Sequence, residues 1–185
     1  MIDILHAPLP YEARLPERAA TEIDLIVLHC TELPDLAMAR EYGERVLYED
    51  RGTGASGHYY IDRDGSMLCY VDPLRIANHT RGFNPRSIGI ELVNLGRYPD
   101  WFDSRRQEMT EPYPEAQIGA LRALLGHLLA RFPSLGHVAG HEDLDTAMVP
   151  ASNDPDTEVP RKRDPGPQFP WARALQGLRL TRLDT

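Results

Sequence analysis

Apolar and polar positions follow two different periods along the chain, and each period predicts a different kind of element. Short runs of apolar and β-branched residues at 24–30 (DLIVLHC) and 86–94 (RSIGIELVN) predict buried strands. Residues 58–72 contain two further β-rich runs joined through Asp64-Gly65, a dipeptide typical of hairpin turns. The short apolar run at 137–144 predicts a strand that leaves the core.

Helical spacing occurs in three other segments. Residues 35–50 combine good helix formers with apolar residues near helical spacing, and residues 169–180 predict a terminal helix. Residues 115–132 carry the clearest pattern and end before Pro133, with apolar side chains at three- and four-residue steps at Ile118, Leu121, Leu125, Leu128 and Leu129. These segments and the strands occur in mixed order without a repeat, which favours an α/β or α+β fold in one domain.

The remaining segments are rich in proline, glycine and polar residues. Residues 1–23 are expected to form an arm that lies on a domain spanning 24–180. Residues 51–57 (RGTGASG) form a glycine-rich loop, and residues 96–114 an irregular connection. Residues 145–167 are expected to be a long loop, acidic in its first part and basic at Arg161-Lys162-Arg163.

Length and composition narrow the class of protein. A chain of 185 residues with 42% hydrophobic and 26% charged residues is typical of one globular domain. Its net charge of −8 argues against nucleic acid as the main partner, since phosphate binding relies on Lys and Arg. The two cysteines, Cys30 and Cys69, do not form a disulfide framework.

The sequence shows none of the usual signs of membrane attachment. No window approaches the roughly 20 apolar residues that a membrane span needs. The first residues lack a basic start, and Asp, His and Pro interrupt their apolar runs, so they resemble neither a signal peptide nor an anchor. We therefore expect the protein to be cytoplasmic.

Two histidines and one aspartate are candidate metal ligands. His29 and His141 each end a predicted strand, and Asp164 lies in the RKRDPG turn. Two imidazoles and one carboxylate form the usual three-residue shell of a catalytic zinc site, in which water takes the fourth position. The sequence contains neither H-E-x-x-H nor C-x-x-C, and each histidine alone is equally compatible with a hydrogen-bonded structural role.

Glu91 and Lys162 are candidate catalytic residues. Glu91 interrupts an apolar strand, so it either faces solvent by strand alternation or acts as a general base in a partly dry pocket. Lys162 lies two residues before Asp164, where a cation could stabilise a negatively charged oxygen, although a solvated basic turn is the alternative.

Other residues beside the central strands could line a pocket. We name His58, His79 and Arg86 as candidate substrate-binding residues, and each could equally be structural. Tyr59 is expected to be structural. His137 is left out of the metal shell because two strand positions four residues apart lie more than about 10 Å from each other. His6 and His127 are expected at the surface.

A set of motifs in fixed order resembles a known enzyme family. IVLHC, SGHYYIDRDG, ANHTRG, SIGIELVN, AGHEDL and RKRDPGPQFPW, spread over residues 24–172, resemble the zinc-dependent N-acetylmuramoyl-L-alanine amidases of the type-2 amidase family. The most specific pieces are SIGIEL and K-x-D-P-G-P-x-F-x-W. Compared with close relatives, about a dozen extra residues within the acidic segment 145–160 separate the second histidine from the lysine. The second departure is ANHTRG, where many relatives have Trp before the histidine.

The resemblance implies a fold, a metal and a reaction. It implies a central mixed sheet flanked by helices, with one Zn²⁺ per chain at one end of the sheet, held by His29, His141 and Asp164. It implies Glu91 as the catalytic glutamate and Lys162 as the catalytic lysine. The implied substrate is a muropeptide or peptidoglycan fragment, cleaved between the lactyl group of (anhydro-)N-acetylmuramic acid and L-alanine by a monomer.

Three alternatives to a recycling enzyme remain open at this point. The same chemistry serves phage endolysins, which could also lack a signal peptide. A non-catalytic muropeptide-binding module would be marked by loss of a zinc ligand, and all three ligands are present. A metal hydrolase of another specificity is the third. The 145–160 insertion is expected to shape the cleft, to act as a lid, or to be a plain solvated loop.

Overall fold

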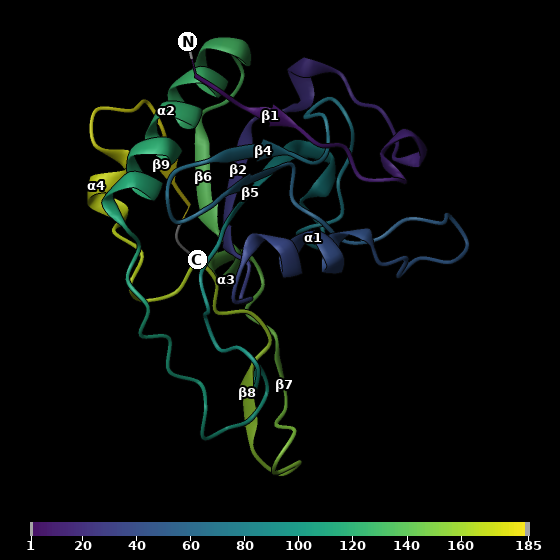
Figure 1. Cartoon of the computed structure of the whole chain (residues 1–185), viewed down its shortest axis with the longest axis vertical. Coiled ribbons are helices and arrows are strands. Elements are labelled where there is room, and N and C mark those ends of the chain that lie inside the picture. Colours follow the sequence, from purple (N-terminus) through teal and green to yellow (C-terminus); the bar gives the residue numbers. More distant parts are fainter. Residues whose placement is uncertain (1, 184–185) are drawn as a thin grey trace.

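A seven-stranded mixed sheet forms the centre of the computed structural model, which describes residues 2–183 (Figure 1). The strand order is β1-β4-β3-β5-β2-β6-β9, and every neighbouring pair is parallel except β3 and β4. A separate antiparallel ribbon consists of β7 and β8. The strands are β1 Leu5–His6, β2 Leu25–Cys30, β3 Tyr59–Ile61, β4 Met67–Cys69, β5 Ser87–Leu92, β6 His137–Gly140, β7 Met148–Pro150, β8 Glu158–Pro160 and β9 Thr181–Arg182.

Helices lie on both faces of this sheet. The fold class expected from the sequence, a mixed sheet flanked by helices, is confirmed. The α-helices are α1 Leu36–Glu44, α2 Glu115–Arg131, α3 His141–Leu144 and α4 Trp171–Leu175, and the 3₁₀-helices are η1 Glu12–Arg14, η2 Ala20–Glu22 and η3 Asn84–Arg86. Within residues 2–183, none of the helices is long and apolar enough to cross a membrane.

Strand alternation assigns the side chains of β2 and β5 to two layers. Ile26 and Leu28 of β2 pack with Ile88 and Ile90 of β5 in a fully buried core that α2 and α4 complete. The intervening residues therefore face the opposite side of the sheet. His29 and Glu91 are among them, and they are register partners in the parallel β2–β5 pair. The sequence thus places both side chains together on the face away from α2.

The first segment of the chain contributes to the opposite face. Its predicted arm supplies β1, which pairs in parallel with β4 at one edge of the sheet. Leu9, Tyr11 and Leu15 are buried in a second core with Ala39 of α1. Among the described residues 2–23, this segment therefore contributes to the sheet and the core, and the division between arm and domain stays a prediction.

The hairpin is confirmed, but the helix predicted at 35–50 is shorter. β3 and β4 pair antiparallel, and Gly65 in their connection has a φ of +90°, a conformation that glycine adopts without steric cost. The helix begins after Asp35, whose side chain accepts the Met38 amide, and ends at Glu44. Beyond it the backbone turns back, so that the Tyr48 amide donates to Thr53 O.

Three predictions for the second half of the chain are corrected. The strand predicted at 137–144 ends at Gly140, because the next residues form the helical turn α3, capped by Asp143 on the Gly140 amide. The loop predicted at 145–167 contains the β7–β8 ribbon, which projects from the body of the domain (Figure 1). The terminal helix predicted at 169–180 is only α4, after which β9 joins the sheet.

Candidate metal centre and active site

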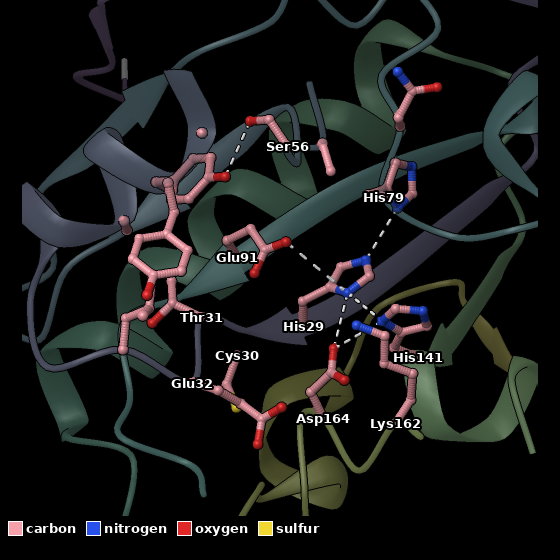
Figure 2. Close-up of a pocket in the computed structure, with 17 residues that line it drawn as sticks. His29, Cys30, Thr31, Glu32, Ser56, His79, Glu91, His141, Lys162 and Asp164 are labelled. Carbon is pink, nitrogen blue, oxygen red and sulfur yellow. Dashed lines mark hydrogen bonds and ion pairs between the residues drawn. The ribbon is translucent and has the colours of Figure 1, made fainter. Parts of the chain in front are cut away.

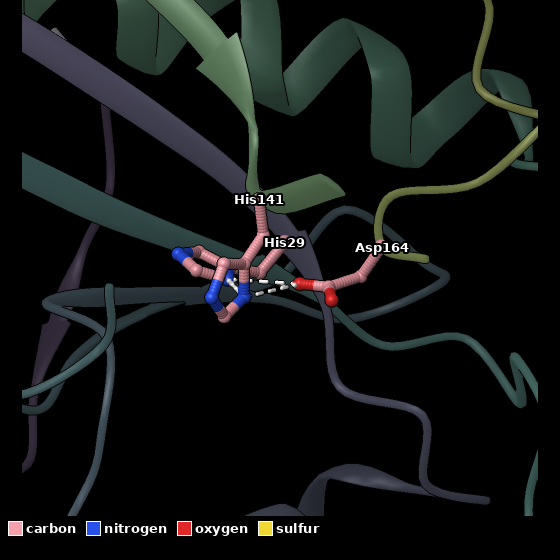
Figure 3. Close-up of side chains that lie close together, drawn as sticks. All are labelled: His29, His141 and Asp164. Atoms are coloured by element: carbon pink, nitrogen blue, oxygen red, sulfur yellow. Dashed lines mark hydrogen bonds and ion pairs between the residues drawn. The ribbon is translucent and has the colours of Figure 1, made fainter. Parts of the chain in front are cut away.

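Three buried side chains converge at the carboxyl end of β2 (Figure 3). His29 belongs to β2, His141 follows β6, and Asp164 lies in the segment after β8. Nδ1 of His29 lies 3.0 Å from Nδ1 of His141 and 2.9 Å from Oδ2 of Asp164, and His141 Nδ1 lies 3.0 Å from that same oxygen. Each residue is at most 3% exposed. The parallel order β5-β2-β6 brings these distant residues together because parallel strands end at the same edge.

A hydrogen-bond chain fixes which nitrogen of His29 carries the proton. The Ser87 hydroxyl donates to Phe83 O, so its oxygen accepts from Nε2 of His79 at 3.2 Å. Nδ1 of His79 is then an acceptor for Nε2 of His29, 3.0 Å away. His29 is therefore protonated on Nε2, and the lone pair of its Nδ1 points at His141 and Asp164. A metal-binding histidine usually donates its other ring N–H to a neighbouring acceptor, which fixes the orientation of the ring.

These residues fit a zinc ion. Two neutral imidazole nitrogens and a carboxylate oxygen are a donor set of catalytic zinc sites. A tetrahedral ion with bonds of about 2.0–2.1 Å separates its donors by about 3.3 Å, close to the 2.9–3.0 Å found here. The second carboxylate oxygen of Asp164, Oδ1, is buried and has no hydrogen-bond partner within residues 2–183, and a bound cation would explain this unsatisfied polar atom.

The electrostatics of the cluster keep its donors in the forms that bind metal. Burial, and next the charge of His141, lowers the pKa of His29 to about 4, so its ring is neutral near pH 7. Burial by itself would raise the pKa of Asp164, but its interactions with His141 and His29 outweigh that effect and hold the pKa well below its usual range. A neutral imidazole and an ionised carboxylate are the forms that coordinate zinc.

Glu91 lies beside this cluster in a largely enclosed position. Its Oε1 is 4.0 Å from His29 Nδ1, and its side chain is 15% exposed (Figure 2). Burial, and next the charge of Asp164, raises the pKa of Glu91 to about 8. As strand alternation predicts, Glu91 points away from Ile88 and Ile90. On that side of the sheet its side chain enters a pocket instead of open solvent. Gly57 leaves room for the Glu91 side chain in this position, since a Cβ there would lie 2.7 Å from Glu91 Cγ.

Two cavities meet at the cluster. The first, of about 260 Å³, is lined by the three candidate ligands, Glu91, Glu32, Tyr42 and Tyr60 among others. The second, of about 400 Å³, is lined by Arg51, Arg81, Arg161 and Asn84 among others. His79, His141 and Lys162 line both cavities. Figure 2 shows the Lys162 side chain extending toward His29 and Asp164. A substrate can therefore extend to both sides of the cluster.

Two of the three candidate substrate-binding residues lie elsewhere. His58 is fully buried and lines neither cavity: its Nδ1 accepts the Gly89 amide, and its Nε2 donates to Arg75 O. Arg86 precedes β5, at the opposite end of that strand from Glu91, and pairs with Asp24. The contacts that these two residues make are therefore structural, and their substrate contact stays an untested prediction. His79 lines both cavities, so its substrate contact stays a prediction beside its contact with His29.

Sequence reasoning missed residues that surround the site. Tyr60 lines the first cavity, and its hydroxyl lies 3.0 Å from Ser56 Oγ, whereas Tyr59 is buried in the core as expected. Alternation along β3 predicts that the two tyrosines face opposite sides, but not which one faces the site. Glu32 and Arg97 form a buried ion pair beside the cavity, and nothing in their sequence spacing indicates that pairing.

The fold and the site define a mixed α/β domain with a candidate metal centre at one edge of its sheet, and comparison with known proteins gives the family. The sequence profile of the N-acetylmuramoyl-L-alanine amidase family matches residues 19–167. The chain therefore belongs to this family and is an enzyme with N-acetylmuramoyl-L-alanine amidase activity.

Individual relatives agree with this membership. The chain is 26% identical to the 1,6-anhydro-N-acetylmuramyl-L-alanine amidase AmpD of Enterobacter cloacae, over 94% of this chain and 89% of that protein. It is 28% identical to the endolysin of Escherichia phage T7, over 70% of this chain and 82% of that protein. Among solved structures, Escherichia coli AmiD in complex with anhydro-N-acetylmuramic acid-L-Ala-D-gamma-Glu-L-Lys is 26% identical, with a TM-score of 0.63 over 85% of this chain and 58% of that chain.

Proposed function

We propose that this amidase removes the stem peptide from soluble anhydro-muropeptides, with one zinc ion held by His29, His141 and Asp164. The proposal rests on one geometric observation: the three donor atoms converge within hydrogen-bond distance of one another, and the Glu91 carboxyl group lies 4.0 Å from one of them. The AmiD complex and the AmpD relative support the choice of an anhydro sugar.

Glu91 is the proposed general base and acid. A carboxylate with a raised pKa accepts a proton near neutral pH and can return it in the next step. Glu91 therefore takes a proton from the attacking water and delivers it to the nitrogen of the leaving L-alanine. Zinc, when bound, would supply the Lewis acidity that activates water and polarises the lactyl carbonyl.

Lys162 is proposed to stabilise the negative charge that develops on the lactyl carbonyl oxygen. It lines both cavities, and its side chain extends toward His29 and Asp164, so a carbonyl oxygen held beside these residues would lie near its ammonium group (Figure 2). A positioned cation in such a partly enclosed site stabilises an oxyanion more strongly than it would in water.

The test combines metal analysis with cleavage. Purified protein should contain one zinc per chain and release the stem peptide from anhydro-N-acetylmuramyl peptides. Chelation should stop release, and added zinc should restore it. Zinc-loaded protein that leaves this substrate intact would refute the proposed substrate, and protein that binds no zinc would refute the assignment of the three ligands.

A lytic role is the second candidate, because the chain also resembles phage endolysins. The same preparation should be assayed on intact peptidoglycan sacculi. Faster release from sacculi than from soluble fragments at equal concentrations of cleavable amide would favour the endolysin role. The reverse preference would support recycling of fragments.

Three further properties belong to this proposal. The β7–β8 ribbon, which holds the 145–160 insertion, is proposed to border the substrate cleft, because Arg161 follows β8, lines the second cavity and pairs with Asp145. The monomeric state stays a prediction that light scattering would test. The cytoplasmic location stays a prediction that cell fractionation would test.

A further inference from the structure

Glu32 and Arg97 form a buried ion pair next to the candidate metal centre. Arg97 Nε donates to Glu32 Oε1 at 2.7 Å, and Nη2 donates to Oε2 at 2.9 Å. The Arg97 amide donates to Oε1 as well, at 3.1 Å. The arginine side chain is 1% exposed and the glutamate side chain 10%. The pair is therefore held in one geometry with little access to water.

Arg97 also reaches the segment that carries Lys162 and Asp164. Its Nη1 donates to Pro160 O at 2.9 Å, and its Nη2 is 3.4 Å from Arg161 O. These carbonyls immediately precede Lys162. At the other end of the pair, Glu32 lies three residues after His29. One guanidinium group thus connects the end of β2, which supplies the first ligand, to the segment that supplies the third.

The backbone of Glu32 adopts a conformation that is rare for residues other than glycine, and the contacts of its side chain with Arg97 help to hold it there. Glu32 has a φ of +50°, and among residues 2–183 it is the only residue other than glycine with a positive φ. Trp101 Nε1 donates to its carbonyl oxygen at 3.0 Å, so partners hold both the backbone and the side chain. Left-handed backbone at a non-glycine residue persists where its surroundings impose it, and such positions cluster at functional sites.

Charge gives a second reason for the pair. Glu32, Glu91 and Asp164 all line the first cavity. A bidentate arginine offsets one of these three carboxylates without occupying the cavity. Buried ion pairs are weak contributors to stability in themselves, so the position of this one beside the site calls for another explanation.

We infer that Glu32 and Arg97 are positioning residues that set the place of Lys162 and Asp164 relative to His29. The inference rests on the proposed zinc site and deepens it. Neither residue touches the reacting atoms. They act through the backbone carbonyls of Pro160 and Arg161, and so through the direction in which the next residues enter the site.

Arg97→Lys tests this role, because lysine keeps the positive charge but cannot hold both Glu32 and the two carbonyls. Arg63→Lys is the matched control: Arg63 forms a bidentate pair with Glu111 and donates to Pro34 O, yet contacts no residue of 158–166. Zinc affinity is measured by chelator competition, kcat and KM on the muropeptide, and amide hydrogen exchange of residues 158–166 in metal-free protein.

Arg97→Lys should lower zinc affinity roughly 10- to 100-fold, as loss of outer-shell partners does. It should lower kcat with little change in KM, and it should speed exchange in residues 158–166. Arg63→Lys should change none of the three. Equal effects of the two variants, or wild-type zinc affinity and exchange in Arg97→Lys, would overturn the inference.

A double variant separates positioning from charge balance. Glu32→Gln with Arg97→Met removes both charges and also removes the links to Pro160 and Arg161. Positioning predicts that this protein remains as impaired as Arg97→Lys, while recovery of wild-type zinc affinity would contradict it. The exchange measurement needs neither zinc nor substrate. It therefore decides the inference even if the proposed metal or substrate proves wrong.

Discussion

Four histidine rings lie in a row, and the two ends of the row use their nitrogens differently. The ring centroids of His141, His29, His79 and His58 are spaced by 4.6, 5.2 and 5.5 Å along the row. Both end residues are buried, His141 at 3% and His58 at 0% exposure. We call the end at His141, which belongs to the candidate metal centre, the metal end, and the end at His58 the structural end. Burial alone therefore does not distinguish the two ends.

At the metal end, protein partners cannot satisfy the nitrogens. The two Nδ1 atoms of His29 and His141 face each other at 3.0 Å, and both lie within 3.0 Å of one oxygen of Asp164. At the structural end, both ring nitrogens of His58 have hydrogen-bond partners. Its Nδ1 accepts from the Gly89 amide, and its Nε2 donates to Arg75 O. Unsatisfied hydrogen-bonding groups, rather than burial, therefore mark the candidate metal centre.

Glu91→Gln should produce the largest effect on turnover of the variants considered. Glutamine keeps the size of the side chain but cannot take a proton, so kcat should fall by about 10²–10⁴-fold. Zinc content should stay at one per chain, because Glu91 is not among the three converging residues. Metal analysis and a cleavage assay on the same preparation check both parts. Near wild-type turnover would show that another group moves the proton.

Asp164→Asn changes one of the three proposed metal ligands. The amide keeps the shape of the carboxylate but loses the charge that draws both imidazoles together, so zinc affinity should fall at least about 100-fold. Chelator competition measures the loss. A matched change at Asp24, which pairs with Arg86 at the far end of β5, should leave zinc affinity unchanged. Tight zinc binding by Asp164→Asn would mean that the metal has other ligands.

His79→Phe removes the imidazole that lies between His29 and His58 in the row. Phenylalanine fills much of the same space but removes the acceptor for Nε2–H of His29, which lies 3.0 Å away. Loss of such an outer partner should lower zinc affinity by roughly 10- to 100-fold. If zinc affinity is unchanged while KM rises, His79 serves the substrate rather than His29.

The sequence predicted the elements that carry the ligands, because strand patterns are local. The β2 and β5 runs have the apolar, β-rich composition of buried strands, and SIGIEL and the K-x-D-P-G-P closure are specific enough to place Glu91, Lys162 and Asp164 in one family pattern. The parallel register that sets His29 opposite Glu91 then follows from the fold.

The errors arose where long-range partners decide the outcome. The residues next to His58 and His79 in sequence do not indicate which ring reaches the site. In the structure Gly89 and Arg75 contact the nitrogens of His58, while His29 contacts His79. Periodicity likewise extended α1 past Glu44, where pairing of Tyr48 with Thr53 turns the chain back. Contacts between residues far apart in sequence leave no signal in a single chain.

The contribution of His58, at the structural end of the row, to protein stability should depend on pH and not on bound metal. Burial, and next the charge of Arg18, lowers the pKa of His58 to about 3, against about 6.5 for an exposed histidine. The unfolded chain therefore takes up this proton at a pH where the folded protein does not. The contribution of His58 to stability is complete above pH 6.5 and is lost as pH falls from 6.5 toward 3, at up to about 1.4 kcal/mol per pH unit.

His58→Gln isolates this contribution by comparison with wild type. Glutamine keeps a donor for Arg75 O but leaves the Gly89 amide without its acceptor, so stability at pH 7 should fall by about 1–3 kcal/mol. Urea unfolding of metal-free protein at pH 7 and pH 5 gives the loss on acidification for each. That loss should be larger for wild type, since Glu91 and His29 titrate in both proteins and only His58 differs. Zinc affinity at pH 7 should match wild type, because the nitrogens of His58 face away from the metal end, and a drop to the level of His79→Phe would show that the two ends of the row are coupled.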